Sequence, residues 1–350
     1  MPKHQAQRGF FDDQIRLQQL SNENDPLVQL DKYIVWENFR SVLDGVFAIE
    51  KKGKGGRPPY DYVMMFKMLI LQRYYNLSDE QLQFQVLDRL SFMRFLGIEI
   101  SHRVPDRKTI WYFRNRLTEA GAVEKLFASF GESLEKAGLV ANEGKIIDAS
   151  FVEVPRQRNN REENAMVKNG ETPEGWQEYP DKLRQKDLDA RWTKKNNQSF
   201  FGYKNHIKAD GKSKLIDSYV VTDASVHDSQ TLGQLIGEND AGQPLWADSA
   251  YTGEEIEKHL ETHDVTSNIV EKGYRNRPLT AEQNQSNRTK SVVRCRVEHV
   301  FGFIEVSMHG SHIKSIGIKR AGAIIGLMNL TYNIFRSLQL LKIGGLAMSI

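Results

Sequence analysis

The spacing of the apolar residues changes near residue 141 from a helical period to that of short strands. Residues 25–140 repeat apolar side chains at helical spacing, and Asp25, Ser78 and Asp106 stand where helices would begin. After residue 141, short apolar runs predict strands at 145–152, 200–208, 215–222, 245–251 and 265–270. The chain is therefore expected to join an all-helical N-terminal domain to an α/β domain.

The order of the predicted strands also indicates how they pair. A hairpin signal, Asp210-Gly211, separates the second strand from the third, and a helical stretch precedes both the fourth and the fifth strand. This order predicts an antiparallel meander that helical crossovers extend by two strands. In such a mixed five-stranded sheet flanked by helices, the first and fourth strands lie side by side at the centre.

Two of the predicted strands carry an aspartate near the middle or the carboxyl end. Asp148 lies in the run KIIDASFV, and Asp248 lies in LWADSAY. Asp is a poor strand former, and a single Asp at a strand end is often only a turn residue. Because the first and fourth strands are predicted neighbours, their carboxyl ends would bring Asp148 and Asp248 together.

A third carboxylate comes from a predicted helix at residues 291–306. Arg294 and Glu298 are one turn apart beside the apolar stripe of this helix, and they form either an ordinary surface ion pair or part of a site. Together with Asp148 and Asp248, Glu298 would complete a set of three converging carboxylates. Such hard oxygen ligands suit Mg²⁺ or Mn²⁺.

Composition narrows the chemistry further. The chain has 350 residues and one cysteine, Cys295, so it can form neither an internal disulfide nor a zinc site built from several thiolates. The first residues lack the apolar core of a signal peptide, and no apolar run reaches the length of a membrane span. We therefore expect a cytoplasmic protein, in a reducing compartment, that does not enter a membrane.

Several basic segments are candidates for DNA contact, although the net charge of +3 is only mildly basic. The Gly- and Pro-rich connector at 51–59 is either a phosphate-binding segment or a solvated linker. The predicted helix at 107–121 is basic and aromatic, as in a DNA-reading unit, but an amphipathic packing helix is commoner. The candidate DNA-binding residues are Lys51, Lys52, Lys54, Arg57, Arg107, Lys108, Arg114, Arg116, Lys194, Lys195, Arg288, Lys290 and Lys314.

A long polar stretch occupies residues 155–198, inside the predicted α/β domain. It contains two tryptophans, Trp176 and Trp192, and ends in a basic cluster. Loops of this length inside a compact domain are usually functional or else disordered. The sequence leaves open whether the stretch becomes ordered only on DNA.

This arrangement resembles the ribonuclease-H-like fold of DDE transposases. The stretches IIDASFVEVP, FGYKNHIKAD, VVTDASVHDSQ, LWADSAYTG and RCRVEHVFGFIE are similar to motifs of the insertion-sequence-five branch of the bacterial IS-four/IS-five transposases. GGRPPYDYVMMFKMLILQRYYNLSDEQL resembles the helical N-terminal domain of the same group. The resemblance covers about residues 55–340 and rests on several separate motifs in the right order.

The resemblance implies an enzyme with Asp148, Asp248 and Glu298 as its catalytic triad. In such an enzyme the triad holds two Mg²⁺ or Mn²⁺ ions, nicks the ends of an insertion sequence and joins the 3′-hydroxyl ends to target DNA. Two alternatives remain open at this point. One is a metal-dependent nuclease of the same fold, and the other is a DNA-binding protein that has lost catalysis.

The resemblance also implies supporting residues. Tyr251 and Arg294 match a tyrosine and an arginine of the group. Two other positions depart from its pattern, because Ser291 stands in place of a tyrosine and Glu305 in place of a DNA-contacting lysine. His227 either touches metal or DNA near the site or caps a helix, and capping is the reading we favour.

The same resemblance divides the chain into three regions. Residues 1–57 would form an arm, helices and a basic linker, and residues 58–140 a helical domain for DNA binding and dimerisation. Residues 141–345 would form the catalytic domain, with a polar insertion at 155–198. The implied partners are the terminal inverted repeats of the element, target DNA and further copies of the chain in a homodimer or larger synaptic complex. The implied location is the nucleoid of a bacterial cytoplasm.

Overall fold

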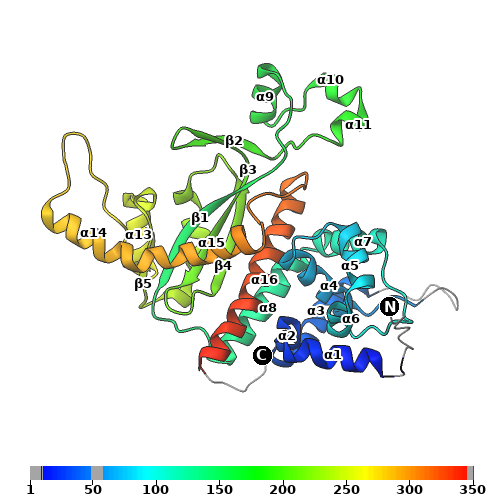
Figure 1. Cartoon of the computed structure of the whole chain (residues 1–350). Coiled ribbons are helices and arrows are strands. Elements are labelled where there is room, and N and C mark those ends of the chain that lie inside the picture. Colours follow the sequence, from blue (N-terminus) through cyan, green and yellow to red (C-terminus); the bar gives the residue numbers. More distant parts are fainter. Residues whose placement is uncertain (1–8, 10, 49–57, 345–349) are drawn as a thin grey trace, which may run out of the picture.

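The computed structural model describes residues 9, 11–48, 58–344 and 350, arranged as Figure 1 shows. The candidate DNA contacts Lys51, Lys52, Lys54 and Arg57 lie outside the described residues. The N-terminal helices lie to one side of the sheet, and the long helix α16 (Ile318–Gly344) runs between the two. This layout is the one expected from the change of apolar period near residue 141.

Local capping fixes where several N-terminal helices begin. The Asp25 carboxylate accepts a hydrogen bond from Leu27 N, Ser78 and Gln81 form a reciprocal capping box, and Asp106 accepts from Thr109 N. The three predicted helix starts are therefore confirmed. The helices are α1 (Asp12–Asn22), α2 (Pro26–Tyr33), the 3₁₀ helix η1 (Trp36–Phe39), α3 (Arg40–Phe47), α4 (Tyr62–Tyr74), α5 (Asp79–Asp88), α6 (Leu90–Leu96), α7 (Arg107–Glu119) and α8 (Ala122–Lys136).

The sheet has the predicted mixed topology. The strands are β1 (Lys145–Glu153), β2 (Arg191–Lys195), β3 (Gln198–Asp210), β4 (Ile216–Asp223), β5 (Pro244–Trp246) and β6 (Thr266–Ser267). β1 pairs antiparallel with β3 and parallel with β5, β4 pairs with β3, and β6 pairs with β5. The central position of the first and fourth predicted strands, which are β1 and β5, is confirmed.

The sheet has six strands rather than five, because part of the polar stretch at 155–198 is ordered as β2. β2 and the first half of β3 form a hairpin that extends past the end of β1. The turn residues Asn196 and Asn197 both have left-handed backbone angles (φ 50° and 63°). Asn tolerates this conformation better than most residues, and the two-residue turn matches the twist of a hairpin.

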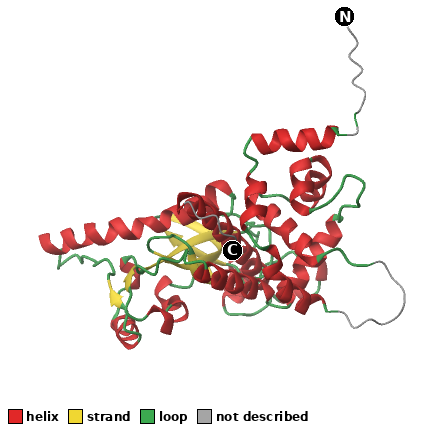
Figure 2. Ribbon diagram, turned by 90° about the horizontal axis from the view of Figure 1, so that it is seen from below, coloured by secondary structure: helices red, strands yellow, loops and turns green. Residues whose placement is uncertain are grey.

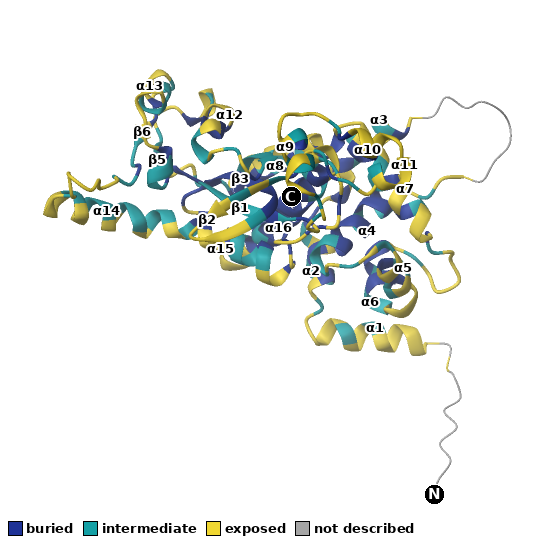
Figure 3. Cartoon of the chain, turned by 90° about the horizontal axis from the view of Figure 1, so that it is seen from above, coloured by how far each residue is buried: buried dark blue, intermediate teal, exposed yellow. Residues whose placement is uncertain are grey.

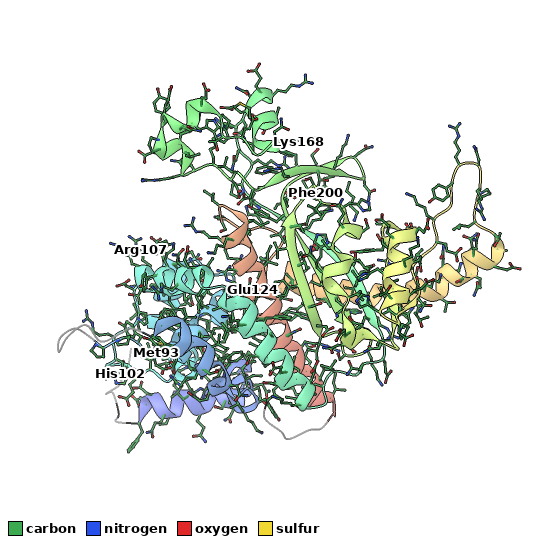
Figure 4. The ribbon with its side chains drawn as sticks, turned by 180° about the vertical axis from the view of Figure 1, so that it is seen from behind. Met93, His102, Arg107, Glu124, Lys168 and Phe200 are labelled. Carbon is green, nitrogen blue, oxygen red and sulfur yellow. The ribbon has the colours of Figure 1, made fainter. Side chains whose placement is uncertain are left out.

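The rest of the polar stretch forms a small helical unit of α9 (Arg161–Lys168), α10 (Glu174–Gln177) and α11 (Pro180–Leu183). Trp176 is its fully buried centre, and the indole Nε1 donates to Glu163 Oε1 at 2.6 Å. Figure 4 shows Lys168 in this unit and Phe200 in the hairpin that adjoins it. Phe200 stacks on Phe151 of β1 at 4.3 Å between ring centroids, so the hairpin is held against the sheet.

Helix α16 is apolar on nearly all sides and joins the two halves of the molecule. It packs against β3 and β4 on one side and against α2, α4, α7 and α8 on the other. Asn329 exchanges two hydrogen bonds with Asn205 of β3, at 2.8 and 3.0 Å. The Asn333 amide pairs with both backbone groups of Ile216, which starts β4. These amides satisfy buried polar groups and fix the position of the helix on the sheet.

Helices and loops surround the sheet (Figure 2), among them the crossover segments and the helices that follow them in sequence. These elements are η2 (Asp228–Thr231), α12 (Leu232–Leu235), η3 (Glu238–Asp240), η4 (Ser249–Tyr251), α13 (Glu254–Thr262), α14 (Ala281–Arg294), η5 (Cys295–Val297), α15 (Glu298–Gly302) and the π-helical turn η6 (Phe303–Ser307). α14 projects from the body of the protein and buries none of its residues (Figure 3). In the described part of the chain, no helix combines the length and apolarity that a membrane span requires.

Candidate active site

The parallel pairing of β1 with β5 brings two aspartates to the same place. Lys145 pairs with Leu245, and Ile146 pairs with Trp246. Two residues beyond the second pair, the two segments reach Asp148 and Asp248. Asp148 lies inside β1. The strand predicted at 245–251 is shorter than expected, because β5 ends at Trp246 and Asp248 lies two residues beyond it. Parallel neighbours with this register place the two carboxylates close together, where β5 ends beside β1.

Asp148 is partly buried, with 19% of its side chain exposed. Burial raises the pKa of this carboxyl group to about 6, and the charge of Asp248 acts in the same direction. A hydrogen bond from Ala149 N to Oδ1 (2.8 Å) and the guanidinium of Arg294, 3.3 Å from Oδ2, lower the pKa. Asp148 is thus ionised at neutral pH, but burial makes the ionised form less favourable. A cation bound to the carboxylate would stabilise that form.

Asp248 is fixed by the short helix that follows it. Its Oδ1 accepts a hydrogen bond from Ala250 N at 2.8 Å, so that Asp248 caps η4. η4 ends at Tyr251, whose fully buried hydroxyl has no hydrogen-bond partner among the described residues. Burial raises the pKa of Tyr251, and so do three nearby carboxylates, those of Asp228, Asp148 and Asp248. Tyr251 therefore remains a neutral donor beside the two aspartates.

Glu298 does not form a metal-binding cluster with the two aspartates among the described residues. It is exposed at the start of α15, one turn after Arg294, which contacts Asp148. Within the described ranges, no three acidic, His or Cys side chains lie close enough to hold a metal ion. The helix predicted at 291–306 is also not one regular helix, because it passes through a 3₁₀ turn and then a π turn. These turns change which side chains face β1.

The π turn places Glu305 against β1. Ser150 Oγ donates to Glu305 Oε1 at 2.6 Å, and Ser150 lies two residues after Asp148 on the same face of the strand. A fourth carboxylate therefore adjoins the site at the position where the resemblance led us to expect a lysine. Asp148 and Asp248 fit as oxygen ligands for Mg²⁺ or Mn²⁺, and Glu305 supplies a further carboxylate beside β1.

Sequence reasoning missed a buried charged cluster next to these residues. Lys204 Nζ donates to Asp228 Oδ1 at 2.8 Å and to Val226 O at 2.7 Å. His206 is fully buried, with Nδ1 3.9 Å from Asp228 Oδ1, and burial lowers its pKa to about 4. The available signal was the pair of motifs FGYKNHIKAD and VVTDASVHDSQ, which contain these residues. His227 is exposed and caps η2 through Ser229 instead of joining the cluster.

The nine candidate DNA-binding residues that the structure describes fall into two groups. In the first group, the charged side chain already binds another part of the protein. Arg107 forms an ion pair with Glu80, and Arg114 forms one with Asp79. Arg116 donates to Val46 O, and Lys290 donates to Ile269 O. In the second, the side chain is exposed and no ion pair is recorded within the described ranges. This second group consists of Lys108, Lys194, Lys195, Arg288 and Lys314.

Comparison with known proteins identifies both halves of the chain. A family model described as "Transposase domain (DUF772)" matches residues 15–116, and one described as "Transposase DDE domain" matches residues 141–334. Among solved structures, the chain is similar to a piggyBac transposase synaptic complex with hairpin DNA, determined by cryo-EM. The sequence identity is 11%, the TM-score is 0.47, and the match covers 92% of this chain and 76% of that chain.

The two family models follow one another along the chain in the order of the helical half and the sheet. The second model alone spans more than half of the 350 residues and includes Asp148, Asp248 and Glu298. The chain therefore belongs to the DDE transposases, DNA-binding enzymes of DNA transposition that generally use divalent metal ions.

Proposed function

We propose that this transposase, of the insertion-sequence-five branch, nicks the ends of its element and joins the 3′-hydroxyl ends to target DNA. The observation that carries the proposal is the placement of Asp148 of β1 beside Asp248, which follows the end of the parallel strand β5. Arg294 and Tyr251 contact or face this pair from two other elements. The substrates would be the terminal inverted repeats of the element and the target duplex.

Asp148, Asp248 and Glu298 are the residues that would hold two Mg²⁺ or Mn²⁺ ions. When bound, such ions activate the attacking oxygen and stabilise the leaving 3′-oxygen of an in-line displacement. Arg294 now neutralises Asp148, and Glu298 is its neighbour one turn along the helix. A rotation of this helical segment would therefore exchange a cation for a carboxylate beside Asp148. Tyr251 would keep its proton and donate a hydrogen bond within the site.

We also expect the chain to act as a homodimer or larger complex, because the two ends of an element must be held together when they are joined. Sedimentation with and without end DNA would measure this. The polar stretch at 155–198 folds into β2 and three short helices, and Phe200 of the adjoining hairpin strand stacks on Phe151 of β1 beside the site.

The test is nicking of a labelled duplex that carries the DNA flanking the gene, with Mg²⁺ and with EDTA. Asp148→Ala, Asp248→Ala and Glu298→Ala should each bind the duplex and lose cutting by about 100-fold or more, since each removes a ligand of the metal site. Glu255→Ala is the matched control, because Glu255 is an exposed acid of α13 in the same domain. Cutting by all three variants at the wild-type rate would refute the assignment of the triad.

The same assay separates the alternatives. Strand-transfer products distinguish a transposase from a nuclease that only cuts. Binding by the wild-type protein without Mg²⁺-dependent nicking would instead identify a DNA-binding protein that has lost catalysis.

A further inference from the structure

A cationic cleft lies between the N-terminal helices and the catalytic domain, away from the carboxylates. It encloses about 320 Å³ and is formed by one face of α7 and by the segment that leads into α16. Trp111 and Asn115 line it from α7, and Lys314 and Arg320 line it from the other side. These two segments are about 200 residues apart in sequence, so the cleft exists only in the folded protein.

The cleft carries an excess of positive charge. Lys314 and Arg320 are exposed, and no ion pair is recorded for either among the described residues. The nearby acids are engaged, since Asp79 binds Arg114, Glu119 lies 3.6 Å from Lys319 Nζ, and Asp189 accepts a hydrogen bond from Ile318 N at 2.9 Å. The two free cations are therefore available to an anionic ligand.

Trp111 gives the cleft a second, aromatic property. Its side chain is 50% exposed, although large aromatic residues are usually covered in a folded protein. An exposed indole beside unpaired cations is the arrangement that binds single nucleotides, because the base stacks on the ring and the phosphates meet the cations. A cleft of about 320 Å³ has the size of a small-molecule site and is too narrow for a double helix.

The position of the cleft relates it to the candidate active site. The backbone of Glu153, at the end of β1, donates from N to Ser311 O and accepts at O from Ile313 N, so the segment that carries Lys314 is bound to the end of β1. Asp148 and Glu153 are five residues apart on the strand, which corresponds to about 17 Å. This distance equals roughly five base steps of DNA.

We propose that the cleft between α7 and the start of α16 binds one unpaired nucleotide of the DNA strand held at the active site. The base stacks on Trp111, and the flanking phosphates contact Lys314 and Arg320. The proposal rests on the proposed function for its substrate class, but it concerns binding and needs no metal ion.

The test measures fluorescence anisotropy of the full chain with a labelled single strand of about 20 thymidines and with a duplex of the same length, both in EDTA. Trp111→Ala should weaken single-strand binding by about tenfold or more and duplex binding by about twofold or less. Trp111→Phe should restore most of the affinity. Replacing Lys314 and Arg320 together by Ala should lower the salt dependence of single-strand binding by about 1.4 in the log–log slope.

Two variants serve as matched controls. Tyr112→Ala removes an equally exposed aromatic residue of α7 that faces a different cavity, and Lys319→Ala removes a neighbouring cation that is paired with Glu119. Both should bind the single strand as the wild-type protein does. The proposal is overturned if Trp111→Ala behaves like Tyr112→Ala, if it weakens the duplex as much as the single strand, or if the wild-type protein does not bind the single strand.

Failure of this proposal and failure of the proposed function are distinguishable. Nicking by Asp148→Ala with Mg²⁺ tests the proposed function alone, whereas single-strand binding by Trp111→Ala in EDTA tests the cleft alone. If instead the nicking assay refutes the triad, the anisotropy results still decide whether the cleft binds an unpaired nucleotide.

Discussion

The folded protein disfavours the ionised form of Asp148. Burial raises the pKa of this carboxyl group from 3.8 to about 6. The folded state therefore binds this proton more tightly than the unfolded chain does. As the pH rises from about 4 to about 6, the unfolded state loses its proton first, so the free energy of unfolding falls. Above about pH 6 the ionised Asp148 carboxylate lowers the free energy of unfolding by its full amount.

Asp148→Asn removes this penalty and should stabilise the protein. A shift of about two pKa units corresponds to about 3 kcal/mol, so the variant should gain up to that free energy of unfolding at pH 8 and little at pH 4. Urea unfolding followed by tryptophan fluorescence at both pH values measures the difference. A variant that is less stable than the wild type at pH 8, or a difference that does not change with pH, would contradict this account.

Divalent metal should act on the same residue. Mg²⁺ that binds only the folded state raises the unfolding midpoint of the wild-type protein, and EDTA reverses the effect. The midpoint of Asp148→Asn should respond much less, because the variant lacks one charged ligand. Below about pH 6 the wild-type response should also shrink, since protons compete with the metal for Asp148. Equal responses of both proteins at pH 8 would exclude Asp148 as a ligand.

The sequence predicted the placement of some site residues better than that of others. Asp148 and Asp248 could be placed together because strand order fixes which carboxyl ends are neighbours. The exposed position of Glu298 could not be predicted, because apolar spacing does not distinguish a regular helix from one with 3₁₀ and π turns. Lys204 and Asp228 were missed because the partner of a buried cation lies in another element and leaves no local pattern.

At the scale of elements, α16 contains two glycines with opposite surroundings. A Cβ atom at Gly326 would overlap the Tyr219 hydroxyl and approach Val123 Cγ1 to 2.8 Å, whereas a Cβ at Gly322 would meet no atom within 4 Å. Gly326 therefore allows the close packing of α16 between the sheet and α8. Gly322 lies one turn earlier on the same helix and has no such role.

Gly326→Ala should consequently lower the free energy of unfolding by about 1–3 kcal/mol, the usual cost of overpacking a core. Gly322→Ala is its control and should raise the free energy of unfolding by about 0.5–1 kcal/mol, because Ala favours a helix more than Gly does. Chemical denaturation of the two variants under the same conditions measures both effects. Equal effects of the same sign would show that packing at Tyr219 does not limit the position of α16.

The hairpin of β2 and β3 is one element that sequence reasoning did not find. Its signal was present, since Asn196-Asn197 separates two runs that contain Trp, Thr and Phe. The surrounding polar composition of residues 155–198 concealed it, because both strands are exposed where they leave the sheet. By contrast, the helices that begin at Ser78 and Asp106 carry strong local caps and were placed to within two residues.

At the scale of the whole molecule, the helical and catalytic regions share one core. A single cluster of buried residues extends from Leu27 and Phe66 of the N-terminal helices through Ile325 of α16 to Ile207 of the sheet. Apolar spacing predicted the change from helices to strands near residue 141. It could not predict that the last helix returns between the two regions, because sequence periodicity does not show which surface a fully apolar helix contacts.

This shared core has a consequence for the boundary predicted between residues 140 and 141. A fragment of residues 141–344 would expose the faces of α16 that α2, α4, α7 and α8 now cover, so we expect it not to fold by itself. The intact chain should unfold in one calorimetric transition. A chain that begins at residue 25 is the control, because α1 buries none of its residues and its loss should change the midpoint little. Cooperative unfolding of the 141–344 fragment, measured by calorimetry or by a well-dispersed amide spectrum, would show instead that the sheet and α16 carry a sufficient core of their own.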